Sequence, residues 1–188
     1  MEHQMTKLFD HDEITKRISE MAAQITEDYR GKVTEENPAL ILCTLRGAVF
    51  FSADLVRQIK IPCELDFVKV HSYCGTRPAD VPVFDLGENI NVAGRHVLIV
   101  EDIVDTGHTM DTMLKRFSGQ NAASVRVCTL LDKPSRREVP GIIPDYTGFS
   151  IDDLFVIGWG LDYNEKYRLL RDIMVYHPTE TEHETLRR

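Results

Sequence analysis

One stretch, Val97 to Met110, limits the possible folds of this chain more than any other. It begins with four apolar residues of strand type and continues through two adjacent carboxylates, two β-branched residues, a third carboxylate and the sequence Thr-Gly-His-Thr. A helical pattern follows immediately. A buried strand that ends in acids and leads through a small-residue loop into a helix is typical of α/β proteins, in which strands and helices alternate.

The loop inside this stretch has the features of a site for a phosphorylated sugar. Backbone amides of the loop and of the helix start can hold a phosphate dianion without a lysine. The hydroxyls of Thr106 and Thr109 add donors, and Gly107 lets the backbone approach closely. The three acids suit ribose hydroxyls, a Mg²⁺ ion or a proton in transfer. The alternative is a solvated acidic turn before a capped helix, which three acids and two threonines in this register disfavour.

The composition excludes several classes of protein. A chain of 188 residues with 43% hydrophobic and 28% charged residues fits one soluble globular domain. Its net charge of -8 argues against a general nucleic-acid binder, and we see no signal peptide and no apolar run that could span a membrane. The four cysteines are widely spaced, which predicts reduced thiols in the cytoplasm and no zinc site.

Along the rest of the chain, the hydrophobic patterns also alternate between strands and helices. The segment 72–94 is the exception, because Gly and Pro interrupt it and only residues 81–86 could pair. We expect a mobile lid there, with a variable surface loop as the alternative. The whole predicts a parallel, twisted α/β sheet with helices on both faces and a ligand site at the carboxyl ends of the strands. The expected helices are 12–30, 48–59 and 109–117, and the expected strands are 39–44, 64–70, 96–100, 125–131 and 154–157.

The stretch that ends at Thr109 closely resembles the phosphoribosyl pyrophosphate (PRPP) signature of type I phosphoribosyltransferases. In that signature four apolar residues, two acids and two apolar residues precede Asp-Thr-Gly-x-Thr, and every position is met here. The resemblance implies that Glu101 and Asp102 orient the ribose hydroxyls and bind Mg²⁺. It implies that Asp105 is the catalytic general base or acid, and that the 5′-phosphate lies on Asp105, Thr106, Gly107, His108 and Thr109.

Two shorter segments resemble other parts of the same site. Leu45, Arg46 and Gly47 follow a predicted strand and resemble the pyrophosphate loop of the family, whose backbone amides face the leaving group. Ser72 and Tyr73 resemble the start of its closing loop, which folds over the pyrophosphate. A lid of this kind is needed because water would capture an oxocarbenium-like transition state.

The segment 130–137 closely resembles a part of bacterial hypoxanthine phosphoribosyltransferases. The match implies that Lys133 donates to the exocyclic oxygen at C6 of the purine, which accepts hypoxanthine, guanine or xanthine and rejects adenine. A lysine at a strand end is more often solvent-facing, so this role depends on the resemblance. We expect Arg136 and Arg137 to be surface or subunit-contact groups.

Residues 155–168 resemble the purine-binding hood of these enzymes. The resemblance implies that Phe155 stacks on the base, that Val156 reads its edge and that Ile103 also contacts it. It implies a second Mg²⁺ contact for Asp162, through water, and a pyrophosphate contact for Arg168. The alternative makes Phe155 a core aromatic residue and Asp162 a turn residue.

Together these segments cover residues 39 to about 172, in the order of the hypoxanthine-guanine phosphoribosyltransferase family. The resemblance implies a single domain, residues 1–188, with a core at about 32–150, a hood formed by the N-terminal segment and about 151–176, and a flexible loop at about 72–94. It implies an Mg²⁺-dependent purine salvage enzyme that transfers 5-phosphoribose from PRPP to N9 of hypoxanthine or guanine and gives IMP or GMP and pyrophosphate. We expect a cytoplasmic homodimer or homotetramer that binds neither nucleic acid nor membrane.

Three alternatives remain open. The first is a phosphoribosyltransferase for another base, such as xanthine or a pyrimidine. The second is a regulatory protein that keeps the fold and binds RNA or protein, against which the acidic charge and the intact set of catalytic-type residues weigh. The third, a receiver-type phosphoacceptor domain, explains the acids and a strand-end lysine but gives no purpose to Ser72, Tyr73 or the hood.

Overall fold

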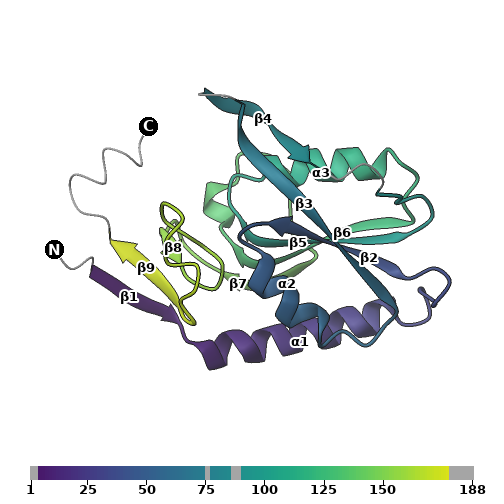
Figure 1. Cartoon of the computed structure of the whole chain (residues 1–188), viewed down its shortest axis with the longest axis horizontal. Coiled ribbons are helices and arrows are strands. Elements are labelled where there is room, and N and C mark those ends of the chain that lie inside the picture. Colours follow the sequence, from purple (N-terminus) through teal and green to yellow (C-terminus); the bar gives the residue numbers. More distant parts are fainter. Residues whose placement is uncertain (1–3, 75–76, 86–89, 178–188) are drawn as a thin grey trace.

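A six-stranded sheet forms the centre of the computed structural model, which describes residues 4–74, 77–85 and 90–177, with backbone alone for 4, 70–74 and 77–85 (Figure 1). Five strands are parallel, and the sixth pairs antiparallel at one edge. The predicted parallel α/β sheet is therefore confirmed. The order is β4 (Arg77–Asp85), β3 (Cys63–Cys74), β2 (Ala39–Leu45), β5 (His96–Val104), β6 (Ser124–Asp132) and β7 (Tyr146–Ser150).

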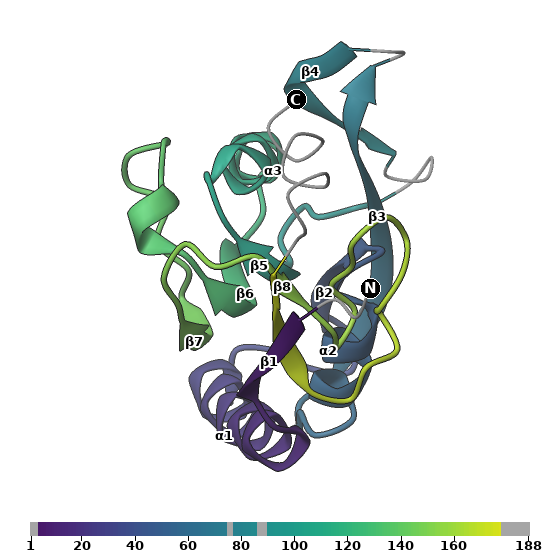
Figure 2. The same ribbon diagram turned by 90° about the vertical axis from the view of Figure 1, so that its left-hand side faces the viewer.

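Helices cover both faces of this sheet, as the sequence predicted. Helices α1 (His11–Tyr29) and α2 (Val49–Val56) lie on one face, and α3 (His108–Ser118) lies on the other (Figure 2). Each face has its own cluster of buried apolar side chains. Asp10 caps the N-terminus of helix α1, because its carboxylate accepts hydrogen bonds from the amides of Asp12 and Glu13. Its buried residues recur at helical spacing and face the sheet: Ile14, Ile18, Met21, Ala22, Ile25 and Tyr29.

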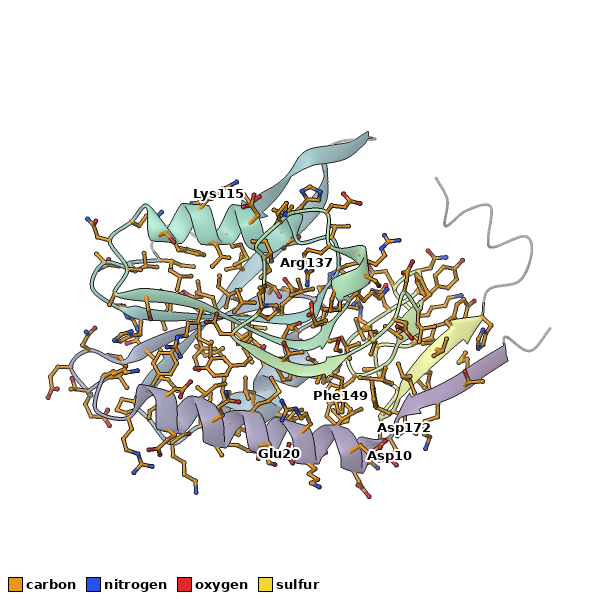
Figure 3. All side chains as sticks on the ribbon, turned by 180° about the vertical axis from the view of Figure 1, so that it is seen from behind. Asp10, Glu20, Lys115, Arg137, Phe149 and Asp172 are labelled. Carbon is orange, nitrogen blue, oxygen red and sulfur yellow. The ribbon has the colours of Figure 1, made fainter. Side chains whose placement is uncertain are left out.

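A second, three-stranded antiparallel sheet lies beyond one end of the central sheet. It has the order β1 (Gln4–Phe9), β9 (Ile173–His177) and β8 (Val156–Ile157). We call this sheet, together with Phe155 and residues 158–172, the hood. Phe9 stacks on Phe149 of β7 with ring centroids 4.0 Å apart, and the Asp172 carboxylate accepts from the His11 amide at 2.9 Å. Phe149, Asp10 and Asp172 mark this junction in Figure 3. The hood is thus fixed to the central sheet at the start of α1.

The structure contains strands that the sequence patterns did not predict. These are β1, β7 and β9, together with the extension of β3 beyond residue 70. The extended β3 pairs with β4, so the backbone of residues 72–74 and 77–85 forms a ribbon within the segment expected to be a lid. Residues 75–76 and 86–89 lie outside the described part of the chain, and the mobility of the segment stays a prediction.

In the described part of the chain, no helix combines the length and apolar character that crossing a bilayer requires. Cys43, Cys63 and Cys128 are free thiols. Burial raises the pKa of the Cys43 thiol to about 11, which keeps it protonated at neutral pH.

Candidate active site

The loops that follow β2, β5 and β6 meet at the carboxyl edge of the central sheet, where α/β proteins bind their ligands. After β2, the Leu45–Arg46 peptide bond is cis. The next residue, Gly47, lies directly against Asp102, and a β-carbon at position 47 would overlap its carboxylate. Gly160 of the hood packs against the Gly47 carbonyl, because a β-carbon at position 160 would overlap that oxygen. The predicted pyrophosphate loop, the acids after β5 and the hood therefore come together at Gly47.

Glu101 and Asp102, which we call the acid pair, lie at the end of the continuous buried run of β5 that begins at Val97. Glu101 is only 9% exposed, and its Oε1 accepts a hydrogen bond of 2.7 Å from the Thr44 hydroxyl. Asp102 accepts from the Ile103 amide at 3.0 Å. Burial, together with the neighbouring Asp102, raises the pKa of Glu101 well above its usual range, and burial raises the pKa of Asp102. Two adjacent, poorly solvated carboxylates form a site that favours a cation.

The loop 105–109, which we call the phosphate loop, leads from β5 into α3. Gly107 precedes the helix with a φ of 93°, a left-handed conformation that glycine adopts without penalty. The Thr106 carbonyl accepts from the amides of Glu138 and Val139 at 3.0 and 3.2 Å. His108 Nε2 lies 3.0 Å from a Glu138 carboxylate oxygen. The loop is therefore supported from one side by the segment after β6.

Arg137 joins these two segments. Its burial contradicts the surface position that we expected for it, whereas a subunit contact, the other position expected, stays untested. Its side chain is 12% exposed and lies beneath α3 (Figure 3). The guanidinium donates to the Asp105 carbonyl and pairs with the Asp132 carboxylate, which is also 12% exposed. The side chain also lies against Gly107, where a β-carbon would come within 2.9 Å of its Cδ. Arg137 thus fixes the backbone on which the third acid of the motif stands.

Asp105 is 38% exposed and faces the two cations that follow β6. Lys133 Nζ lies 3.8 Å from Asp105 Oδ2, and Arg136 Nε lies 3.0 Å from Asp105 Oδ1. The Lys133 side chain is only 8% exposed, so it is not the solvent-facing lysine that a strand end usually carries. The Lys133 amide donates to the Val104 carbonyl at 3.0 Å, which ties the end of β6 to the end of β5.

In the hood, Val156 is the first residue of β8, and Phe155 directly precedes it. Phe155 is 37% exposed and meets the ring of Tyr163 edge-on, with centroids 5.7 Å apart and planes at 90°. Its other neighbour is Tyr176, 6.0 Å away. Val156 is buried and pairs with Val175 of β9. An aromatic ring that is held by two others and remains partly exposed can stack on a planar ligand. Ile103, at the end of β5, is half-buried.

Arg168 connects the hood to the acid pair through its charge. It donates to the Gly160 carbonyl at 2.7 Å and lies 2.8 Å from Asp162 and 3.2 Å from Glu165. Its positive charge opposes the rise in the pKa of Asp102. Arg46 also pairs with Glu165, at 2.8 Å. Arg168 and Asp162, which were both predicted to serve the site, are therefore partners of each other in this structure.

Ser72 and Tyr73 fall where the structure describes the backbone alone, so their side chains lie outside the described residues. Among the described residues, no group of three or more His, Cys, Asp or Glu side chains could hold a metal ion. Mg²⁺ in enzymes that handle phosphates is usually held by one or two carboxylates and by the substrate itself. The acid pair fits that donor set.

Sequence reasoning missed Thr44 and the role of Arg137. Thr44 stands in a run of buried strand residues, where nothing in the pattern separates a hydroxyl that supports a carboxylate from ordinary core packing. The partner of Arg137 in the phosphate loop is a backbone carbonyl, which leaves no signal in a sequence. The short run of charges at 132–137 was the available hint that this loop matters.

Comparisons with known proteins agree with this geometry. The phosphoribosyl transferase domain family matches residues 4–166. A hypoxanthine-guanine phosphoribosyltransferase of Streptococcus pneumoniae is 46% identical over 165 residues, which are 87% of this chain and 88% of the relative. A hypoxanthine-guanine-xanthine phosphoribosyltransferase of Tritrichomonas foetus is 41% identical, over 87% of this chain and 86% of the relative.

Among solved structures, the hypoxanthine phosphoribosyltransferase of Trypanosoma cruzi in complex with the product IMP superimposes with a TM-score of 0.86. It is 39% identical and covers 94% of this chain and 95% of its own. Sequence, fold and the convergence of the acid pair, the phosphate loop and the hood lead to one assignment. This chain belongs to the phosphoribosyltransferase family, in its hypoxanthine-guanine branch.

Proposed function

We propose that this enzyme transfers 5-phosphoribose from PRPP to N9 of hypoxanthine or guanine, and that it releases pyrophosphate in the salvage of purines. The observation that carries this proposal is the separation of 3.8 Å between Lys133 Nζ and Asp105 Oδ2. A 6-oxopurine presents O6 and N7 side by side on one edge. A donor and a carboxylate at this spacing can meet both atoms at once, and the ammonium of Lys133 has no acceptor to offer to the amino group of adenine.

Asp105 moves the proton in this reaction. The N9–C1′ bond of the nucleotide forms while the bond from C1′ to the pyrophosphate oxygen breaks. The purine loses its proton from N7 to the Asp105 carboxylate, which works as a general base in this direction and as a general acid in reverse. Its 38% exposure leaves it accessible to a base bound against Phe155. Lys133 and the ring of Phe155 orient the purine so that N9 faces the ribose.

The other residues hold PRPP. The amides of the phosphate loop receive the 5′-phosphate at the start of α3, and the acid pair orients the ribose hydroxyls. The acid pair would hold Mg²⁺, which would supply positive charge to neutralise the leaving pyrophosphate. The turn at residues 45–47 and Arg168 contact that pyrophosphate. Asp162, 2.8 Å from Arg168, positions this arginine and would contribute a further carboxylate near the Mg²⁺ site.

The decisive experiment measures pyrophosphate release from PRPP and Mg²⁺ with each of hypoxanthine, guanine, xanthine, adenine and uracil. Turnover with hypoxanthine or guanine, and none with adenine or uracil, is the expected result. Lys133→Met should raise KM for hypoxanthine and leave KM for PRPP unchanged. Turnover with uracil alone would assign the enzyme to a pyrimidine, and binding of PRPP without turnover of any base would favour a regulatory protein.

We also propose that the enzyme acts in the cytoplasm as a homodimer or homotetramer. Large apolar side chains are exposed beside the site, among them Phe50 at 39% and Leu169 at 82%. Phe50 and Leu169 line one hollow together, and a contiguous exposed apolar surface often marks a protein–protein interface. Sedimentation velocity of the protein at micromolar concentration should give a mass above that of one chain, and a single monomeric species would contradict this proposal.

A further inference from the structure

Two acidic and two basic side chains beside the candidate base site form one closed group of charges. Asp153, just before Phe155, completes the group that Asp105, Lys133 and Arg136 begin. Lys133 Nζ lies 3.7 Å from Asp153 Oδ1, nearly the same as its distance of 3.8 Å from Asp105 Oδ2. Arg136 spans the same two acids, with Nε 3.0 Å from Asp105 Oδ1 and Nη1 3.4 Å from Asp153 Oδ2. Each carboxylate thus directs one oxygen to each cation.

The position of Lys133 within this group is unusual for a lysine. Its side chain is only 8% exposed, whereas that of Asp153 is 56% exposed. A buried ammonium beside a single carboxylate closes to a short, charge-assisted hydrogen bond, because the attraction is poorly screened. The Lys133 ammonium instead lies beyond hydrogen-bond distance from either acid. Both carboxylates attract the ammonium, and it forms a hydrogen bond with neither of them.

We propose that Asp153 is a positioning residue, which draws Lys133 away from Asp105 and so keeps both groups available to a 6-oxopurine. This inference rests on the proposed function, in which Lys133 donates to O6 and Asp105 takes the proton from N7. Without the charge of Asp153, Lys133 closes on Asp105, and the resulting ion pair occupies both groups before the base arrives. Asp153 therefore controls affinity for the base, while the acid pair and the backbone amides of the phosphate loop, which hold PRPP, are unaffected.

Asp153→Asn tests this role, because it removes the charge and keeps the size of the side chain. We expect KM for hypoxanthine to rise about tenfold, the loss typical of one charge-assisted contact, while KM for PRPP stays unchanged. Asp153→Glu, which retains the charge, should restore most of the affinity for the base. The matched control is Asp152→Asn, which changes the neighbouring exposed acid and should leave both constants as they are.

Circular dichroism and the thermal midpoint of each variant establish whether the fold is retained. We expect it to be retained, because Asp153 is exposed. An equal rise of both KM values would overturn the inference, since a general distortion acts on both substrates. Identical kinetics for Asp153→Asn and Asp152→Asn would overturn it too. If instead the unmutated enzyme turns over no 6-oxopurine, the proposed function itself fails. The activity of the unmutated enzyme therefore distinguishes a failure of the proposed function from a failure of the inference about Asp153.

Discussion

Gly47 and Asp102 lie so close together that a β-carbon at position 47 would occupy the space of the Asp102 carboxylate. The contact joins the turn after β2 to the acid pair after β5. Gly47 is therefore required for its lack of a side chain, since its backbone fits against a carboxylate that is itself part of the site.

Gly47→Ala should lower turnover by about a hundredfold, because displacement of a positioning group by even 1 Å costs that much. Initial rates at saturating PRPP and hypoxanthine measure the effect. Gly119→Ala is the matched control, since Gly119 has an ordinary helical φ of -71° and its nearest neighbour would be 3.5 Å from a β-carbon. Full activity of Gly47→Ala would mean that the acid pair tolerates movement and does not orient the ribose.

Arg137→Ala should destabilise the fold and weaken the phosphate loop together. The substitution leaves the buried Asp132 carboxylate without its cation and the Asp105 carbonyl without its donor. We expect the free energy of unfolding to fall by about 3 kcal/mol, as is typical when one partner of a buried ion pair is removed. Urea unfolding measures it. The control is Lys115→Ala, because Lys115 pairs with Asp111 on the surface of α3 and is 75% exposed. That change should cost less than about 1 kcal/mol.

Asp105→Asn should lower kcat by at least about a hundredfold and leave the dissociation constant of PRPP nearly unchanged, because the amide cannot accept the purine proton. Initial rates at saturating substrates give kcat, and equilibrium binding of PRPP gives its dissociation constant. Asp111→Asn on α3 preserves both and serves as control. An equal loss in turnover and in PRPP affinity would show that Asp105 holds the sugar phosphate and does not move the proton.

His96 should make the fold sensitive to mild acid. Burial lowers its pKa below 6.5, and the charges of Lys32 and Arg126 lower it further. The unfolded chain therefore binds more protons than the folded one below pH 6.5, so stability falls as the pH drops from 6.5 through the lowered pKa of His96.

His96→Gln should reduce this loss while it retains a hydrogen-bonding group for Ser124, which lies 2.8 Å from His96 Nδ1. The urea midpoints of both proteins are compared between about pH 5 and 8. The contribution of the carboxylates to the pH dependence is the same in both proteins and cancels in the difference. Parallel curves for the two proteins would assign the acid sensitivity to other groups.

Much of the fold could be predicted because long segments with clear periodicity fix their own structure. Helix α1 and strands β2, β5 and β6 appeared within a few residues of the expected bounds. Strand β7 could not be found, because its five residues include Gly148, whose backbone packs against the Leu130 carbonyl and not through a side chain. Strands β1 and β9 are short, and each depends on a partner at the far end of the chain.

The candidate site also has a part that could be predicted from the sequence and a part that could not. The acid pair and the phosphate loop form one continuous motif, so the sequence alone predicts that they act together. Contacts between separate segments could not be read from it, since nothing in residues 132–137 reveals that Arg137 turns inward to the Asp105 carbonyl. Nor does the sequence indicate that Arg136 and Lys133 share Asp105. These contacts arise from the meeting of strand ends, which only the folded sheet defines.

The pairing of β1 with β9 also determines when the hood can form during synthesis of the protein. The Thr6 hydroxyl and His177 Nε2 are hydrogen-bonded at 3.1 Å, although the two residues are 171 positions apart in the sequence. A ribosome therefore releases the strands that carry the acid pair and the phosphate loop well before β9 emerges to complete the hood. A growing chain therefore contains the acid pair, the loop 105–109 and Phe155 before it contains β9, and a chain truncated before β9 would lack the central strand of the hood sheet.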